Sequence, residues 1–196
     1  MASVPISTSR QTVIDRIAEV MQAQYAAELS AIQDIGLYLP APEAKDYYSV
    51  PQNPDQVIAN HNVAVFIYPS GPRTVQSRAS GGMGVGEMQR RTVPIDVSVI
   101  CRRGMHDPNK PIMWHGKALG SDEILRRRAE RYTGALINTI LKYSACGNAG
   151  IVKVDLIDDM PEIFFDEESD KPMWGIGSAQ FEFTQKVSVP GCRPLP

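Results

Sequence analysis

What the sequence lacks excludes several classes of protein. Its three cysteines, Cys101, Cys146 and Cys192, are widely spaced and form no C-x-x-C pair. They therefore indicate neither a disulfide framework nor a zinc knuckle, and they favour a reducing compartment. Aromatic residues make up only 7% of the chain, which predicts a core built mainly from Val, Ile, Leu and Ala. A net charge of −2 is too balanced for a dedicated nucleic-acid-binding domain, since such domains are usually basic.

Long apolar runs are also missing. Residues 1–10 are polar and contain no apolar segment of signal-peptide length, and no stretch approaches the roughly 18 consecutive apolar residues of a membrane-spanning helix. We therefore expect no membrane association and a soluble protein that is made and used in a cytoplasm. Hydrophobic residues nevertheless make up 43% of the 196 residues, which is enough to bury the core of one domain spanning 1–196.

Two segments have the apolar spacing of an amphipathic helix. In residues 10–35, apolar side chains recur every three or four positions. A second helix is expected to begin at Ser121 as its N-cap, with two acidic residues near the positive end of the helix dipole. The side chains predicted to face the core are Ile14, Ile17, Met21, Tyr25, Glu28 or Leu29, and Ile32 in the first helix, and Leu125, Ala129, Tyr132, Leu136, Ile140 and Tyr143 in the second.

Two kinds of pattern predict strands. The apolar run VAVFIY at 63–68 indicates a buried strand, and residues 151–157 form a further β segment. Residues 90–102 and 176–189 alternate apolar and polar side chains with period two, which is typical of strands with one buried face. Residues 74–80 are expected to pair with 90–102 as a long β-hairpin. The tip of this hairpin is a flexible glycine segment that contains Gly81, Gly82, Gly84 and Gly86.

The remaining segments are expected to be irregular. They are two long loops at 37–62 and 103–120, an acidic segment at 158–172 and a short C-terminal tail at 190–196. Within the acidic segment, residues 163–165 are expected to form a buried patch or a short strand. The element order predicts an α/β fold of the α+β type, a mainly antiparallel sheet with two amphipathic helices packed on one face. Its other face is predicted to be alternately polar, and either solvated or covered by another subunit.

No catalytic, cofactor-binding or metal-binding pattern stands out. The glycine segment has the composition of a phosphate-binding loop, but it precedes a strand, whereas such a loop must open a helix. The acidic residues between 155 and 170 do not follow calcium-loop spacing, and His61, His106 and His115 lie in loops without ligand spacing. Cys146 lies at a helix C-terminus, where the dipole opposes a thiolate. We therefore expect neither an enzyme nor a cofactor.

Charge is unevenly distributed along the chain. The simplest interpretation is a mixed solvated surface. A sharper hypothesis is that basic and acidic edges meet between neighbouring copies, because a head-to-tail ring needs two different complementary patches. Arg128 belongs to the basic cluster of the second helix. The candidate interface residues are Arg90, Arg91, Arg102, Arg103, Arg126, Arg127, Arg131, Asp166, Glu167, Glu168 and Asp170.

The order and texture of these elements resemble a known family. The features are the long first helix, the strand VAVFIY, the long hairpin, the helix EILRRRAERYTGALINTILKY and the closing strand GIGSAQFEFTQKVSV. Together, over about residues 9–189, they resemble the tail terminator, or tail-completion, proteins of long-tailed bacteriophages. The resemblance is one of element order and texture, and no short motif carries it.

The resemblance implies a structural protein of the virion neck that forms a hexameric ring, caps the tail tube and stops its polymerisation. The implied partners are further copies of the chain, the tail tube protein and a head-side neck or connector protein, with a tail sheath contact as a further possibility. Genomic DNA would pass through the lumen without sequence-specific binding, and assembly would take place in the host cytoplasm. Three alternatives remain open: another neck ring such as a head-completion, connector or stopper protein, a tail tube subunit, and a small-molecule-binding domain or enzyme that uses the polar sheet face.

Overall fold

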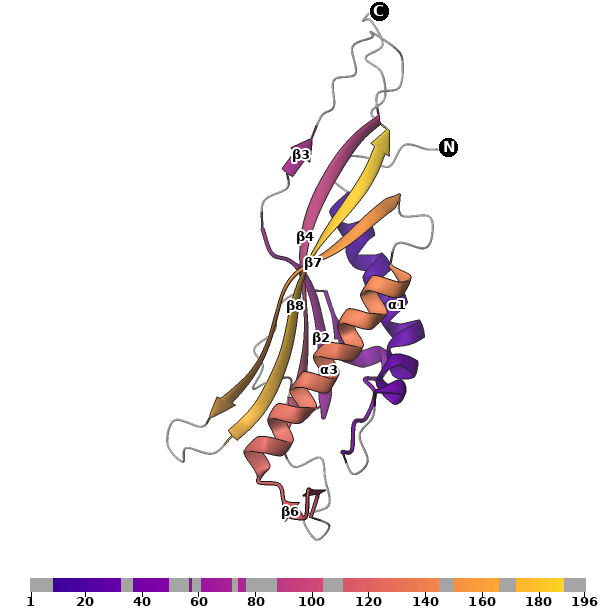
Figure 1. The fold of residues 1–196 in the computed structure, drawn as a ribbon. Coiled ribbons are helices and arrows are strands. Elements are labelled where there is room, and N and C mark those ends of the chain that lie inside the picture. The colour runs from indigo at the N-terminus through magenta and orange to yellow at the C-terminus, as the bar shows by residue number, and fades with distance from the viewer. Residues whose placement is uncertain are drawn as a thin grey trace, which may run out of the picture.

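The computed structural model describes residues 9–32, 37–49, 57, 61–71, 74–76, 88–103, 111–144, 150–165 and 172–188. Two long helices and one large sheet make up most of this part of the chain (Figure 1). The helices are α1 (Ser9–Ala31) and α3 (Ser121–Tyr143), with a short 3-10 helix η2 (Ala44–Asp46). The strands are β1 (Tyr47–Tyr48), β2 (Val63–Pro69), β3 (Thr74–Gln76), β4 (Met88–Arg102), β5 (Met113–Trp114), β6 (Lys117–Ala118), β7 (Ile151–Phe165) and β8 (Pro172–Ser188).

The main sheet has the order β1-β2-β4-β8-β7, and β3 pairs with β4 beyond the end of β2. The β1–β2 pair is parallel and all other pairs are antiparallel, which confirms the predicted mainly antiparallel α+β fold. Every residue of β4 lies opposite a residue of β8, from Met88 to Arg102. The long strands β4, β8 and β7 twist around one another along the length of the molecule (Figure 1).

The predicted hairpin is confirmed at its base. β3 pairs with β4 so that Thr74 lies opposite Thr92 and Gln76 lies opposite Arg90. The glycines of the predicted tip, Gly81, Gly82, Gly84 and Gly86, lie outside the described residues.

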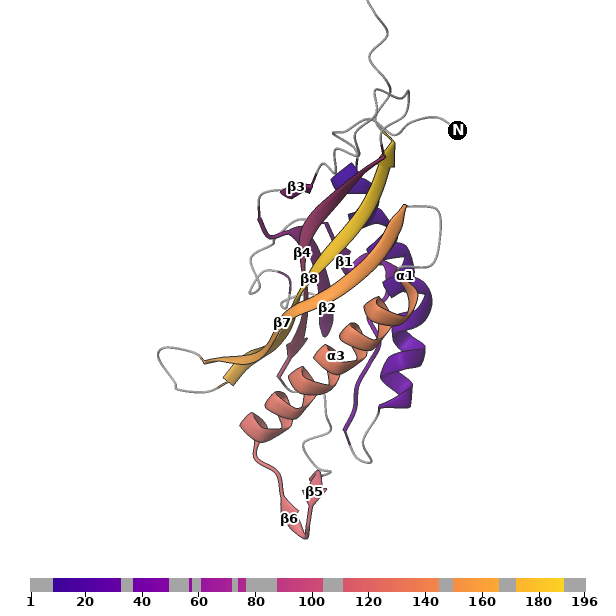
Figure 2. The same ribbon diagram turned by 45° about the horizontal axis from the view of Figure 1, so that its top comes forward.

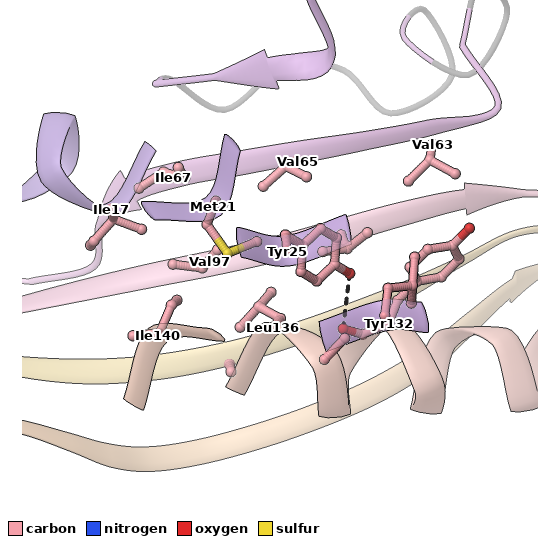
Figure 3. Close-up of a cluster of buried hydrophobic side chains, with 14 of the residues drawn as sticks. Ile17, Met21, Tyr25, Val63, Val65, Ile67, Val97, Tyr132, Leu136 and Ile140 are labelled. Carbon is pink, nitrogen blue, oxygen red and sulfur yellow. Dashed lines mark hydrogen bonds between the residues drawn. The ribbon is translucent and has the colours of Figure 1, made fainter. Parts of the chain in front are cut away.

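Both long helices cover the same face of the sheet and lie side by side (Figures 1 and 2). Their predicted inner faces are confirmed, although Ile32 and Tyr143 at the helix ends are only half-buried. In Figure 3 the core closes around Tyr25, whose hydroxyl donates a 3.0 Å hydrogen bond to the carbonyl of Tyr132. Each fully buried aliphatic or aromatic side chain here stabilises the fold by roughly 1.5–3 kcal/mol relative to exposure. The buried side chains that β4 contributes are Val93, Ile95, Val97, Val99 and Cys101.

Helix α3 comes very close to the backbone of β8 at one point. A Cβ atom added to Gly177 would lie 2.1 Å from Oγ1 of Thr133 and 2.8 Å from the backbone oxygen of Ala129. Only a residue without a side chain fits between β8 and this turn of the helix. Gly177 therefore sets the distance between α3 and the sheet.

The acidic segment differs most from its prediction. Residues 158–165 are not irregular, because β7 continues through them and pairs with β8 as far as Phe165. The register of β7 against β8 shifts at three places, 151/153, 156/158 and 164/165. Its side chains therefore do not alternate regularly, and the sequence pattern stops at residue 157. Asp158, Asp159 and Glu162 are tolerated within the strand because β7 lies at the sheet edge, where their carboxylates reach water.

Two smaller predictions are also corrected. Gly120, not Ser121, is the N-cap of α3, and Ser121 is the first helical residue, with its hydroxyl bonded to the carboxylate of Asp122. The segment 103–120 was expected to be a plain loop, but it contains the small β5–β6 hairpin.

The second face of the sheet is not polar throughout. At one end, Phe66, Ile100 and Trp174 form a separate buried apolar cluster with Val57 from the long connection before β2. This connection is held by a hydrogen-bonded chain in which His61 contacts the carboxylate of Asp46 through Nδ1 and the hydroxyl of Tyr48 through Nε2. The prediction of an alternately polar face therefore holds only for the rest of the sheet, beyond this cluster.

An ion pair between the buried Glu28 and the exposed Lys142 joins the ends of the two helices. Lys142 Nζ donates a 2.7 Å hydrogen bond to Glu28 Oε2, and the hydroxyl of Tyr143 donates a 3.1 Å hydrogen bond to Glu28 Oε1. The hydrogen bond from Lys142, assisted by that from Tyr143, lowers the pKa of Glu28 although burial opposes this effect. The carboxylate form of Glu28 therefore stabilises the α1–α3 pair.

We expect Glu28→Gln to lower the free energy of unfolding at pH 7 and to change it less at pH 3. A lowered pKa stabilises the fold above the unfolded-state value near 4.5, and this contribution is lost as the pH falls through the folded-state value. Urea denaturation at both pH values measures the difference, with Glu19→Gln on the exposed face of α1 as the control. If the wild type and Glu28→Gln differ in free energy of unfolding as much at pH 3 as at pH 7, the expectation is wrong.

Candidate assembly surfaces

A hollow of about 320 Å³ opens on the face of the sheet that carries no helix. Its lining includes Asp96 on β4 and the β7 residues Asp158, Asp159 and Glu162, and none of the described residues that line it is basic. We call this hollow the acidic groove. It lies beyond the apolar cluster of the same face, where the side chains of β4, β7 and β8 are mostly polar.

The floor of the acidic groove is held by hydrogen bonds between strands. The hydroxyls of Ser98 on β4 and Ser178 on β8 are 3.0 Å apart, and Gln180 Nε2 donates a 3.1 Å hydrogen bond to the hydroxyl of Ser70. Oδ1 of Asp96 is buried and accepts no hydrogen bond from the described part of the chain. A buried carboxylate oxygen without a donor is costly, so the groove favours an occupant that brings N–H or O–H groups or positive charge.

The outer edge of β7 is the second candidate surface. In the described part of the chain no strand pairs with this edge, although β7 is 15 residues long. Its second half carries Asp158, Asp159 and Pro161, which are typical devices against unwanted strand pairing. Its first half carries exposed apolar side chains, with Val152 45% and Ile157 50% exposed, on either side of an ion pair between Lys153 and Asp155. We call residues 152–157 the apolar edge.

The small β5–β6 hairpin is the third candidate surface. It extends beyond the first turn of α3, away from the sheet (Figures 1 and 2). Its two-residue turn is formed by His115 and Gly116, both with positive φ, the geometry of a type I′ hairpin turn. Met113 and Trp114 are 54% and 45% exposed, and the guanidinium of Arg127 lies 4.1 Å from the centre of the Trp114 ring. In the sequence, the pair His115-Gly116 is the feature that could have indicated this turn.

The predicted basic residues do not form one exposed patch. Arg102 is exposed and Arg103 is half-buried at the end of β4, whereas Arg91 is buried within the subunit. Arg90 lies opposite Gln76 of β3, and Arg131 is half-buried on α3. The predicted acidic counterparts Asp166, Glu167, Glu168 and Asp170 lie outside the described residues.

The arginines at the start of α3 are already paired within the helix. Arg126 lies 3.3 Å from Glu123 and 3.1 Å from Glu130, and Arg127 lies 2.8 Å from Glu123. Hydrogen bonds from Arg126 and then Arg127 lower the pKa of Glu123. Because these charges are satisfied at the surface, an acidic partner subunit would gain little from them.

The sequence pattern predicted the wrong environment for Arg128. It was included in the exposed basic cluster, but it is 1% exposed, and its Nε and Nη2 atoms have no hydrogen-bond partner in the described part of the chain. Burial lowers its pKa. The helical spacing could have predicted this burial. Position 128 lies three residues after Leu125 and four before Tyr132, on the face of α3 that packs against the core.

The structure also bears on two candidate chemistries. Burial raises the pKa of the Cys101 thiol to about 12, so this thiol is not a nucleophile at neutral pH. Within the described residues, no group of three or more His, Cys, Asp or Glu side chains is arranged so that it could hold a metal ion. In the same part of the chain, neither long helix is apolar enough to cross a lipid bilayer.

No protein-family model matches the chain, and no curated protein matches it significantly. A function is therefore inferred from the three surfaces described above and from the resemblance drawn from the sequence.

Proposed function

We propose that the chain is a structural subunit of a phage tail neck, a tail terminator that assembles into a ring, caps the tail tube and joins it to the head-side neck. The observation that carries the proposal is the apolar edge of β7. It combines a backbone edge that no strand of the described residues pairs with and the exposed side chains of Val152, Leu156 and Ile157. Proteins that remain monomeric usually protect an edge of this kind.

The two edges of the sheet differ, and this difference supports a ring. One edge is the long β7, whereas the other is formed by the short strands β1 and β3. A contact that joins one edge to the other is therefore head-to-tail, and head-to-tail contacts close into rings when the rotation between subunits allows it. Strand pairing would satisfy the backbone groups of the apolar edge and remove its side chains from water.

The resemblance supplies the rest of the proposal. It implies a hexameric ring in the virion neck, in contact with the tail tube protein, a head-side connector protein and possible sheath subunits. DNA would pass through the lumen without sequence-specific contacts, and no membrane is involved. Assembly would take place in the host cytoplasm.

Negative-stain microscopy and sedimentation of the purified protein test the proposal. We expect single rings that do not stack, whereas indefinite tubes would favour a tube subunit and monomers at every concentration would contradict the proposal. Ring decoration at one end of isolated tail tubes would separate a terminator from a connector or stopper ring. Ile157→Lys should reduce the ring population strongly, and Ala23→Lys on the exposed face of α1 is the matched control.

The acidic groove supports one second candidate, a domain that binds a small polar or cationic molecule. Its volume lies near the lower end of the range for small-molecule sites, and one oxygen of Asp96 in its lining has no hydrogen-bond donor among the described residues. A thermal shift produced by such a ligand, in a protein that stays monomeric, would favour this candidate over a ring subunit.

A further inference from the structure

The β5–β6 hairpin has the properties of an anchor for a partner protein. Residues 111–120 contain no acidic side chain, and the tip presents Met113, Trp114 and Lys117 to solvent. Exposed tryptophans contribute large binding energies when a partner covers them, whereas they are costly to leave in water.

The hairpin is also fixed before any partner binds. Its I′ turn holds the two strands in register, and Arg127 lies against the Trp114 ring. At its base, Ile112 is buried and its carbonyl accepts a 2.9 Å hydrogen bond from the N–H of Leu119. A preorganised element loses little conformational entropy when it docks.

The acidic groove has the opposite chemistry. Among the described residues, four carboxylates and no basic side chain line it, while Tyr68 and the half-exposed Met160 give it an apolar surface. Its volume of about 320 Å³ corresponds to roughly ten water molecules, which is enough space for large side chains. Asp96 offers a buried oxygen that has no donor within the described residues.

We propose that the β5–β6 hairpin of one subunit docks in the acidic groove of a second copy of the chain. The apolar side chains of the hairpin would cover Tyr68 and Met160, and Lys117 would face the carboxylates. The hairpin extends from the helix-covered side of the molecule (Figures 1 and 2), whereas the groove opens on the opposite face. A subunit therefore does not fill its own groove, and the contact is head-to-tail.

This inference rests on the proposed ring function and assigns it a second contact, independent of the apolar edge of β7. The hairpin and the groove lie on opposite sides of the subunit, so each subunit would give a hairpin to one neighbour and receive one from the other. Charge complementarity selects the occupant, since Lys117 of the hairpin brings positive charge to a groove whose described lining is acidic.

A photo-crosslinking residue at position 114 tests the proposal directly. Benzoylphenylalanine replaces Trp114 in the full chain, isotopically labelled and unlabelled copies are mixed, and cross-linked peptides are identified by mass spectrometry. We expect cross-links between labelled and unlabelled copies at residues of β7 and β8 that line the groove. Cross-links to another part of the second copy, to a different neck or tail protein, or to no protein would overturn the proposal.

Charge reversal provides an independent measurement. Asp158→Lys combined with Asp159→Lys should raise the self-association dissociation constant roughly 30-fold, as expected for the loss of a hot-spot contact, without lowering Tm. Adding Lys117→Glu to this double variant should restore part of the affinity. Glu19→Lys on α1 is the control for charge alone. An unchanged dissociation constant in the groove variant, or no recovery on adding Lys117→Glu, would count against the docking.

The outcomes separate this inference from the proposed function. Rings whose position 114 cross-links outside the groove would sink the docking and leave the ring function standing. Hairpin-to-groove cross-links in dimers or open chains that never close would support the docking and contradict the terminator proposal.

Discussion

Gly177→Ala should lower the free energy of unfolding by about 3 kcal/mol or more, which corresponds to a fall in Tm of roughly 6–12 °C. The added Cβ would lie 2.1 Å from Oγ1 of Thr133 and 2.8 Å from the backbone oxygen of Ala129. The hydroxyl can rotate away, but the backbone oxygen can move only if α3 shifts relative to β8. Because α3 also packs against β4 and β7, such a shift would disturb much of the core. Thermal and urea denaturation measure the loss.

Gly134→Ala is the matched control for the same chemical change. Gly134 lies in α3, and a Cβ there would meet only Cδ1 of Ile32 at 3.7 Å, an ordinary contact. Because alanine is a better helix former than glycine, the free energy of unfolding of this variant should rise by up to about 1 kcal/mol. Adding Thr133→Ala to Gly177→Ala should recover part of the loss by removing the nearer obstacle. A Gly177→Ala protein as stable as the wild type would show that α3 and β8 are not in such close contact.

Arg128→Met should raise the free energy of unfolding by about 1–3 kcal/mol. The guanidinium of an arginine stays protonated in proteins. Arg128 is 1% exposed, and two of its nitrogen atoms donate to no acceptor in the described part of the chain. Methionine keeps much of the packing of the side-chain stem and removes the buried charge. Arg128→Ala should give a smaller gain or a loss, since it also leaves a cavity.

Arg126→Met is the control for this prediction, because Arg126 lies on the same helix but is exposed and paired with Glu123 and Glu130. Its effect should stay within about 0.5 kcal/mol. Chemical denaturation of the three variants in parallel decides the question. A loss of stability in Arg128→Met larger than in Arg126→Met would mean that the buried guanidinium has a stabilising partner.

The core was predictable because its patterns are local. The three- and four-residue spacing in α1 and α3 and the alternation from Val93 to Cys101 identify the buried faces without reference to any other part of the chain. Local patterns gave wrong predictions where two of them disagreed or where a bulge interrupted one. Arg128 follows the spacing of the inner stripe, but its charge suggested an exposed residue, and the bulge at 156/158 broke the alternation that would have extended β7.

The candidate surfaces were less predictable because they depend on strand register. Tyr68, Asp96, Asp158 and Gln180 are distant in sequence and line one groove only because β2, β4, β8 and β7 are neighbours in the sheet. Nothing in the sequence near Asp96 indicates that Asp158 lies across the sheet from it. The apolar edge was equally hidden, since IVKVDLI predicts a strand but not whether that strand is central or terminal in its sheet.

The position of β8 has a consequence for synthesis of the chain. β8 lies between β4 and β7, yet it is the last of the described strands to be translated, and its partner β4 begins at Met88. Until β8 has left the ribosome, β7 cannot join the sheet and neither the groove nor the free edge exists. Prematurely terminated products would therefore lack both the groove and the β7 edge, and they could not make the contacts proposed above.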